Sequence, residues 1–391
     1  MSNDQRIFLS SPHMSGNEQK YIKEAFDLNW IAPLGNNVDG LEKQLAQYNS
    51  VNGAAVFTSG TAAIHLALKL LNVTKGDKVF CSSLTFVASA NPILYEDATP
   101  ILIDSEPDTW NMSPKALKRA LVEAKNEGHL PKAVIVVNLY GQSAKMDELL
   151  EICETFNVPI IEDAAESLGS TYKGQKSGTF GKFGVFSFNG NKIITTSGGG
   201  ALVSNDTDAL EKARFLSTQA RDKAIHYQHS QVGYNYRMSN IVAGVGRGQM
   251  EVLDERITQR RSVFDRYYQA LNGIEGIAFQ PELDNSFSNR WLTALTIDVE
   301  ATGVSKEEII KELGEHNIEA RPAWKPMHLQ PLFKGVKYYS HDENISISDY
   351  LFEYGLCLPS GSNMSGVDQE KVIYHILKTL EKGKSNVLLH T

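Results

Sequence analysis

The chain has 391 residues, 42% of them hydrophobic and 21% charged, so it is long enough to bury a large core. Its net charge of −8 excludes a general nucleic-acid binder, because affinity for a phosphate backbone requires a basic face. Three widely spaced cysteines argue against a disulfide framework and a cysteine-based metal site, and no stretch reaches about 18 uninterrupted apolar residues. We therefore expect a cytoplasmic enzyme with no membrane span and no bound metal.

Residues 1–35 are expected to form an N-terminal arm. A helical pattern over Asn17–Asp27 is followed by the irregular segment Trp30–Gly35, which we expect to wrap over another part of the molecule. The beginning of the chain has no apolar stretch after a basic region, so we do not expect a signal peptide.

Residues 36–249 are expected to form a large domain in which strands alternate with helices. Apolar residues at i, i+3 and i+4 predict helices over Thr61–Leu71 and Lys145–Phe156. The strands are mostly continuous apolar runs, typical of strands buried on both faces, so we predict an α/β fold with a mostly parallel sheet. The predicted strands are Ala54–Thr58, Lys78–Ser82, Thr99–Asp104, Ala133–Leu139, Val158–Asp163, Gly184–Phe188 and Gly200–Ser204.

Residues 250–391 are expected to form a smaller C-terminal domain. It begins with a long charged helix over Glu251–Leu271, followed by a strand over Trp291–Val299 and helices over Ser305–His316 and Asp368–Lys382. Ligands of parallel α/β sheets bind beyond the carboxyl ends of the strands. Candidate site residues are therefore those that end or follow the predicted strands.

Lys192 stands in a polar turn between two predicted strands. It follows the turn Asn189–Asn191, precedes the apolar pair Ile193–Ile194, and is soon followed by the glycine triplet Gly198–Gly200. A lysine that forms a Schiff base needs a partly desolvated site and freedom to move between cofactor and substrate. The alternative is an exposed turn lysine.

Asp163 ends an apolar strand and is followed by two alanines and Glu166. A protonated pyridine nitrogen needs a buried anionic partner, because its charge makes the ring an electron sink. Asp163 fits this role, and it fits equally well the role of a cap on a following helix.

The segment Phe57–Ala63 runs from a strand through small and hydroxyl residues into a helix. Backbone N–H groups at such a helix start form a ready phosphate site, to which Ser187 could add a hydroxyl. Simple helix capping by Ser59 or Thr61 is the alternative.

Four motifs together resemble the DegT/DnrJ/EryC1/StrS sugar aminotransferases. They are Ser-Gly-Thr-Ala-Ala near residue 60, Glu-Asp-Ala-Ala near 163, Ser-Phe-Asn-Gly-Asn-Lys at 187–192 and Gly-Tyr-Asn-Tyr-Arg-Met-Ser at 233–239. Their order and spacing span nearly the whole chain. The resemblance implies an enzyme dependent on pyridoxal 5'-phosphate (PLP) with the aspartate-aminotransferase-like fold type I.

The resemblance also implies roles for residues of these motifs. Lys192 would be the catalytic residue and would carry PLP covalently, while Asp163 would pair with the pyridine nitrogen. Gly60, Thr61 and Ser187 would hold the phosphate.

Three further cofactor contacts are implied by the same resemblance. Phe86 would stack on the cofactor ring, and Asn235 would reach the phosphate of the neighbouring subunit's cofactor, which implies a homodimer with shared active sites. Glu166 stands where many relatives have Gln or His, and it would contact the ring hydroxyl.

Further segments narrow the resemblance to the UDP-4-amino-sugar aminotransferases of the bacillosamine pathway. These segments are Pro12–Met14, Asn29–Gly35, Arg321–His328 and Leu358–Gly361. They imply transfer of an amino group from L-glutamate to C4 of a UDP-2-acetamido-2,6-dideoxy-4-keto-hexose, giving UDP-N-acetylbacillosamine.

Substrate contacts are expected from the arm, from the motif at 233–239 and from the small domain. Arg237 is a candidate for an anionic group of either substrate, and packing within the small domain is the alternative for Trp324 and His328. The full set is Asn29, Trp30, Ile31, Ala32, Arg237, Trp324, Met327 and His328.

Three other functions stay open to different degrees. A C3-keto-sugar aminotransferase would share the cofactor residues, and a non-catalytic relative could bind PLP without turnover. PLP-dependent sugar dehydratases of this fold replace the lysine with histidine, so Lys192 argues against that reaction.

Overall fold

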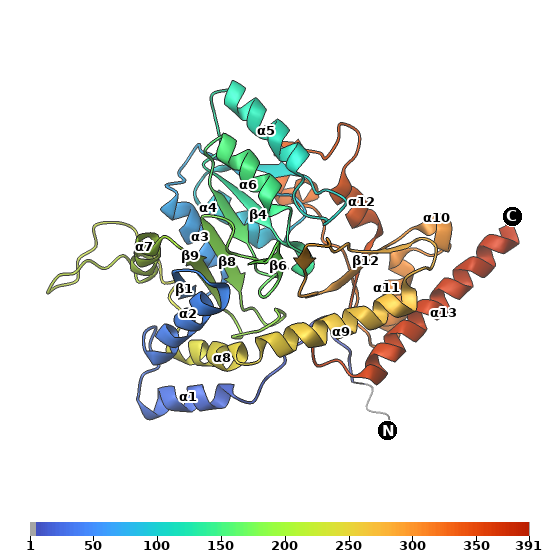
Figure 1. The fold of residues 1–391 in the computed structure, drawn as a ribbon, viewed down its shortest axis with the longest axis horizontal. Helices are drawn as coiled ribbons and strands as arrows, with labels where there is room; N and C mark the ends of the chain where they lie inside the picture. Colours follow the sequence, from blue (N-terminus) through green and yellow to red (C-terminus); the bar gives the residue numbers. More distant parts are fainter. Residues whose placement is uncertain (1–4, 391) are drawn as a thin grey trace.

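The computed structural model describes the backbone of residues 5–390 and the side chains of residues 5–383. Two sheet-based parts lie side by side, and the long helix α9 (Leu253–Leu271) runs along both of them (Figure 1). Within the described residues, no helix combines the length and apolarity that crossing a membrane requires.

The larger part is an eight-stranded sheet with the order β1-β9-β8-β5-β4-β2-β3-β14. The six strands from β8 to β14 run parallel, whereas β9 is antiparallel to both of its neighbours. The predicted mostly parallel sheet is therefore confirmed. The strands are β1 (Gly53–Phe57), β2 (Lys78–Ser82), β3 (Thr99–Ile103), β4 (Ala133–Val137), β5 (Ile160–Asp163), β8 (Phe183–Ser187), β9 (Gly200–Ser204) and β14 (Tyr338–Tyr339).

Helices cover both faces of this sheet because its central strands are apolar on both sides. In β4, Ile135 packs in one hydrophobic cluster with α3 and α7, while Val134 and Val136 pack on the other face with α5 and α6. The helices of this part are α3 (Gly60–Leu70), α4 (Asn91–Tyr95), α5 (Pro114–Asn126), α6 (Met146–Thr155) and α7 (Thr207–Ser217), with short 3-10 helices η1 (Val87–Ser89) and η2 (Leu139–Gly141).

The smaller part is a four-stranded antiparallel sheet with the order β10-β12-β15-β13. Its apolar face packs against α9, α11 and α13. A small three-stranded antiparallel sheet has the order β11-β6-β7, so it pairs one strand after residue 250 with two strands before it. The remaining elements are α10 (Val299–Thr302), α11 (Lys306–Glu315), α12 (Ile347–Tyr354), α13 (Gly366–His390), β6 (Thr171–Tyr172), β7 (Gln175–Lys176), β10 (Ile277–Phe279), β11 (Ser286–Phe287), β12 (Thr293–Ile297), β13 (Arg321–Pro322), β15 (Gly355–Leu358), η3 (Met327–Leu329) and η4 (Pro331–Phe333).

The N-terminal helices α1 (Glu18–Asp27) and α2 (Asn36–Asn49) pack on α8 (Asn240–Met250). Three glycines of α8 make the close approach possible. A Cβ at Gly248 would lie 2.7 Å from the backbone nitrogen of Glu18, and one at Gly246 would lie 2.7 Å from Leu41 Cδ2. These glycines therefore serve helix packing.

One strand crosses the boundary expected near residue 250. The pair Tyr338–Tyr339 belongs to the stretch assigned to the small domain, yet it forms β14 and extends the large sheet beside β3. The backbone N–H groups of Leu102 and Asp104 donate to carbonyls of this segment, so it satisfies the edge of the sheet.

Candidate active site

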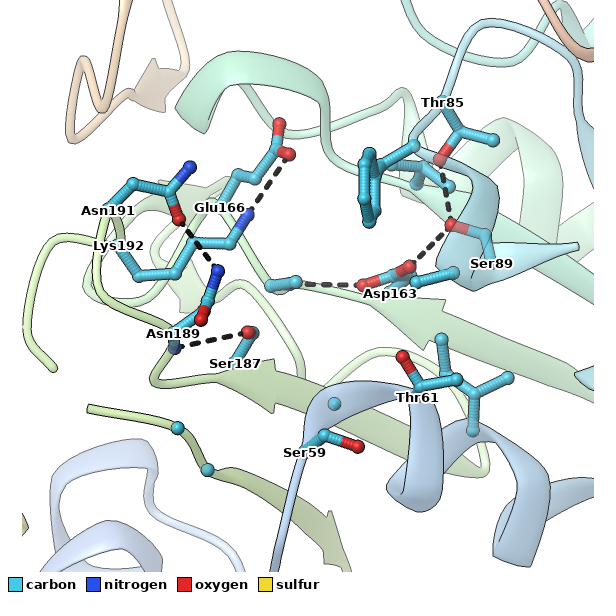
Figure 2. Close-up of a pocket in the computed structure, with 18 of the residues that line it drawn as sticks. Ser59, Thr61, Thr85, Ser89, Asp163, Glu166, Ser187, Asn189, Asn191 and Lys192 are labelled. Atoms are coloured by element: carbon cyan, nitrogen blue, oxygen red, sulfur yellow. Dashed lines mark hydrogen bonds and ion pairs between the residues drawn. The ribbon is translucent and has the colours of Figure 1, made fainter. Parts of the chain in front are cut away.

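A cavity of about 450 Å³ lies at the carboxyl ends of strands β2, β5 and β8 (Figure 2). Its wall is built from residues that end or follow strands, as expected for a parallel α/β sheet. Its lining residues are Thr58, Ser59, Gly60, Thr61, Ile64, Thr85, Phe86, Ala88, Ser89, Val137, Asp163, Ala165, Glu166, Ser187, Asn189, Asn191, Lys192, Gly198, Gly199 and Trp324.

Lys192 is enclosed rather than exposed, since its side chain is only 11% exposed. Its Nζ donates to Glu166 Oε1 at 3.2 Å and lies 4.1 Å from the ring centre of Trp291. Figure 2 shows Lys192 and Glu166 on one side of the cavity, facing Asp163 on the other. The alternative of an exposed turn lysine is therefore wrong.

Asp163 is buried at the end of β5 with few partners. Ser89 Oγ donates to its Oδ2 at 2.7 Å, and the backbone N–H of Ala165 donates to Oδ1 at 3.2 Å. Residues 164–170 form turns, so Asp163 caps no helix. Burial is the main cause that raises the pKa of Asp163, and the positive charge of Lys192 opposes it in part.

Glu166 is also buried, and its two oxygens have different partners. Oε1 accepts from Lys192, while Oε2 accepts from the backbone N–H of Tyr140 at 2.7 Å. Burial raises the pKa of Glu166, with the Lys192 charge again acting in the opposite direction. The cavity thus holds one lysine and two carboxyl groups whose ionised forms are destabilised by burial, a combination typical of catalytic sites.

The start of α3 closes the cavity below Asp163 (Figure 2). Ser59 Oγ accepts from the backbone N–H of Ala62, so Ser59 is the helix cap of the alternative interpretation. The same turn places Gly60 and Thr61 on the cavity wall beside Ser187, the last residue of β8, and a Cβ at Gly60 would lie 3.2 Å from that of Ser187. An anion fits against the amides of this helix start.

These features fit PLP. A buried carboxyl group without a full cationic partner suits a protonated ring nitrogen, and the helix start suits a phosphate. Lys192 lines the same cavity, next to Glu166. Phe86 also lines the cavity, with its ring centre 5.7 Å from that of Trp324.

The predicted substrate contacts divide into two groups. Trp324 lines the cavity, and Met327 lines an adjoining hollow that shares Phe86 and Trp324. The arm residues Asn29–Ala32 are exposed and line neither hollow. Asn240 holds this segment, since its Nδ2 donates to the carbonyl of Trp30 at 2.7 Å.

Arg237 and His328 lie outside the cavity. Arg237 donates to Glu42 and to the carbonyl of Val56, so its guanidinium is occupied within the fold. His328 uses both ring nitrogens, with Nδ1 2.7 Å from Ser83 Oγ and Nε2 2.8 Å from Asp349 Oδ1. Its ring also stacks on Tyr338 of β14, with centroids 3.7 Å apart, so His328 has a packing role, but at the edge of the large sheet rather than within the small part of the molecule.

Asn235 does not line this chain's own cavity. It is exposed and follows the loop after α7, forming an isolated bridge with Thr218. This position leaves its side chain free to meet a second molecule.

Trp291 lies behind Lys192, and its contribution to the site was not indicated by the sequence. It is 1% exposed, its ring faces the amine of Lys192, and its Nε1 donates to the carbonyl of Asn191 at 2.7 Å. It therefore supports both the lysine and the turn that carries it. Trp291 lies 100 residues from Asn191 in sequence, so no local pattern could have paired them.

Comparisons with known proteins agree with this geometry. A family model described as the DegT/DnrJ/EryC1/StrS aminotransferase family matches residues 12–377. EpsN of Bacillus subtilis (strain 168), proposed to be a pyridoxal phosphate-dependent aminotransferase, is 62% identical over 97% of this chain and 98% of its own length. GDP-perosamine synthase of Caulobacter vibrioides is 37% identical over 95% of this chain and 98% of its own.

A second relative and a solved structure extend the comparison. UDP-4-amino-4,6-dideoxy-N-acetyl-beta-L-altrosamine transaminase of Campylobacter jejuni is 31% identical over 89% of this chain and 92% of its own. The crystal structure of a DegT DnrJ EryC1 StrS aminotransferase from Brucella abortus superposes with a TM-score of 0.85 and 27% identity, covering 93% of this chain and 95% of that one. The fold is thus PLP-dependent transferase fold type I.

Substituting Asp163 with Asn should weaken the binding of PLP. Asp163 is expected to pair with the ring nitrogen, and loss of this buried charge pair should cost about 3–5 kcal/mol, weakening PLP binding more than about 100-fold. Equilibrium dialysis of PLP against the variant measures this loss. Asp208→Asn, an exposed change on α7, is the matched control and should bind PLP like the wild type.

The same variant should stabilise the chain prepared without PLP. Folding raises the pKa of Asp163, so its contribution to stability is present at low pH and is lost as pH rises through the folded pKa. Apo Asp163→Asn should therefore melt at a higher temperature than apo wild type at pH 8, with a smaller difference at pH 5. An apo variant that melts lower at pH 8 would contradict the burial argument.

Proposed function

Because the chain belongs to the DegT/DnrJ/EryC1/StrS family of PLP-dependent sugar aminotransferases, we propose that it aminates C4 of a UDP-linked keto-sugar. The substrate is UDP-2-acetamido-2,6-dideoxy-4-keto-hexose, the amino donor is L-glutamate, and the product is UDP-N-acetylbacillosamine. The observation that carries the chemistry is a largely enclosed lysine that shares one cavity with two buried carboxyl groups.

Lys192 is assigned to proton transfer in both half-reactions. Bound PLP supplies an electron sink that stabilises negative charge at the carbon bearing the amino group. Lys192 takes a proton from the α-carbon of glutamate in the first half-reaction and returns one to C4 of the sugar in the second. Glu166, 3.2 Å from its Nζ, holds the freed amine close to the reacting carbon.

Asp163 and Glu166 are assigned to two different polar groups of the cofactor ring. Asp163 keeps the proton on the ring nitrogen, and Ser89 holds the carboxylate in place by donating to it. Burial raises the pKa of Glu166, so this side chain can carry a proton and donate it toward the ring hydroxyl. A carboxyl group can thus do here what Gln or His does in many relatives.

The nucleotide-sugar is assigned to the hollow beside the cavity. Phe86 and Trp324 line both spaces, and Lys325 and Met327 line the outer one. Aromatic and apolar walls with one cation suit a sugar nucleotide whose reactive carbon enters the inner cavity.

The identity of the nucleotide rests on resemblance. The transaminase of Campylobacter jejuni is named for a UDP-linked 4-amino sugar. A GDP-linked 4-keto sugar is the second candidate, because GDP-perosamine synthases from three organisms are 32% to 37% identical to the chain. A C3-keto sugar and PLP binding without turnover are the remaining alternatives.

Turnover on three substrates should identify the reaction. We expect kcat/KM for the UDP-linked 4-keto sugar to exceed that for a GDP-linked 4-keto-6-deoxyhexose and for a UDP-linked 3-keto sugar by at least about tenfold. NMR of the product should place the new amine at C4. A preference for the GDP-linked substrate, an amine at C3 or no turnover on any of them would each refute the proposed reaction.

We also propose that the chain acts as a homodimer with shared active sites. The loop after α7 projects from the molecule (Figure 1) and exposes Ile225, Tyr227 and Val232. Trp30 and Ile31 of the arm are exposed as well. Exposed apolar side chains of this number favour burial against another protein surface. In the dimer, Asn235 would reach the phosphate in the partner's cavity.

Mixing two inactive variants should restore activity if sites are shared. Lys192→Ala removes the catalytic amine, and Asn235→Asp places a negative charge beside the partner's phosphate. A mixed dimer has one intact site, so random exchange of equal amounts should recover about one quarter of wild-type activity. A mixture that stays inactive, or a wild-type chain that light scattering shows to be a monomer, would contradict the shared site.

A further inference from the structure

Three polar side chains meet at the seam between α11 and α13, in the small part of the molecule. Glu312 lies in the last turn of α11, His316 directly follows that helix, and His375 reaches both from α13. Figure 1 shows the two helices side by side, at the opposite end of the molecule from α7. The rings of His316 and His375 are stacked, with centroids 3.7 Å apart.

Both imidazoles direct a nitrogen at one carboxylate oxygen. Glu312 Oε1 lies 3.3 Å from His316 Nε2 and 3.1 Å from His375 Nδ1. In a tetrahedral zinc site with bonds of about 2.0–2.1 Å, neighbouring ligand atoms are about 3.3 Å apart. The three donor atoms lie within 4.8 Å of one another, so they nearly form one face of such a tetrahedron.

The surroundings leave this face open to an ion. Lys382 Nζ lies 3.9 Å from Glu312 Oε2, the oxygen that the imidazoles do not use, so Oε1 stays available to an ion. The side chains of His375 and Glu312 are 8% and 16% exposed, whereas that of His316 is 41% exposed. An ion can therefore enter from the His316 side and keep a water molecule as its fourth ligand.

An ordinary hydrogen-bonded cluster is the competing interpretation. In it, each imidazole would donate an N–H to the same oxygen of Glu312, and the zinc titration below distinguishes the two interpretations. Across residues 5–383, no other group of three His, Cys, Asp or Glu side chains brings its donor atoms this close. The cluster lies outside the cavity, so it has no role in the proposed aminotransferase reaction.

We infer that Glu312, His316 and His375 bind one divalent transition-metal ion of the zinc class. Imidazole nitrogens suit Zn²⁺, Co²⁺ and Ni²⁺, whereas Mg²⁺ and Ca²⁺ prefer all-oxygen sites. The ion ties the end of α11 to α13. Because the unfolded chain has no preformed site, binding stabilises the folded chain. Sequence analysis predicts no metal, since His375 lies 63 residues from Glu312 and no motif links them.

Zinc titration of the PLP-loaded chain, prepared without a histidine tag, tests the site. We expect calorimetry to show one Zn²⁺ ion per chain and thermal denaturation to show a higher melting temperature with zinc. His316→Ala should weaken binding at least roughly tenfold and should lose the zinc-dependent rise, because it removes one of three ligands. The side chain of His316 is 41% exposed, so this change should leave the fold intact.

Two further variants and a spectrum make the test specific. His129→Ala, an exposed histidine outside the cluster, should bind zinc like the wild type, and Glu312→Gln should bind more weakly. Co²⁺ should give the visible band of a tetrahedral site in the wild type and not in His316→Ala. Absence of saturable zinc binding, equal binding by His316→Ala, or equal stabilisation by Mg²⁺ would overturn the inference.

Discussion

Burial of charge at the carboxyl edge of the large sheet is the constraint on which the rest of the structure depends. Lys192, Asp163 and Glu166 sit in one cavity and are nearly out of contact with solvent. Ionised groups in such a place are costly unless they are paired and hydrogen-bonded. Glu166 pairs with Lys192, and Trp291 adds the face of its ring to the same amine. The side chain of Asp163 accepts hydrogen bonds from the hydroxyl of Ser89 and the backbone N–H of Ala165 and from no other described residue, as expected of a carboxylate whose cationic partner is a bound ligand.

The buried side chain of Arg260 links the segments that surround the cavity. Arg260, on α9, is fully buried and donates to the carbonyls of Trp291 and Ser360 and to the hydroxyl of Ser10. It thereby joins the N-terminal arm, the small sheet and the tryptophan that supports Lys192. Burial lowers the pKa of Arg260 to about 9, because the charged guanidinium is removed from water where it makes these contacts. The position of Lys192 therefore depends on contacts between segments that are far apart in the sequence.

Local sequence patterns predicted the parts of this arrangement that are local. The apolar runs of the large sheet, such as β4 with all five residues buried, need only their own composition to be recognised. Lys192, Asp163 and Gly60 were found because each follows or ends such a run. Contacts between distant segments gave no local signal. For example, β14 is only two residues long, and it forms because its backbone hydrogen-bonds to the edge strand β3. In the same way, Arg237 looked free in sequence but is paired with Glu42 on α2.

The central claim is that Lys192 performs the chemistry, and the absorption spectrum with glutamate tests it most directly. The PLP-loaded wild type and Lys182→Ala, which alters an exposed lysine before β8, should each show a visible cofactor band that L-glutamate removes. Lys192→Ala should lack the protein-linked band and should show no turnover when glutamate and the keto-sugar are supplied. A Lys192→Ala variant that kept both the glutamate-sensitive band and turnover would contradict the account.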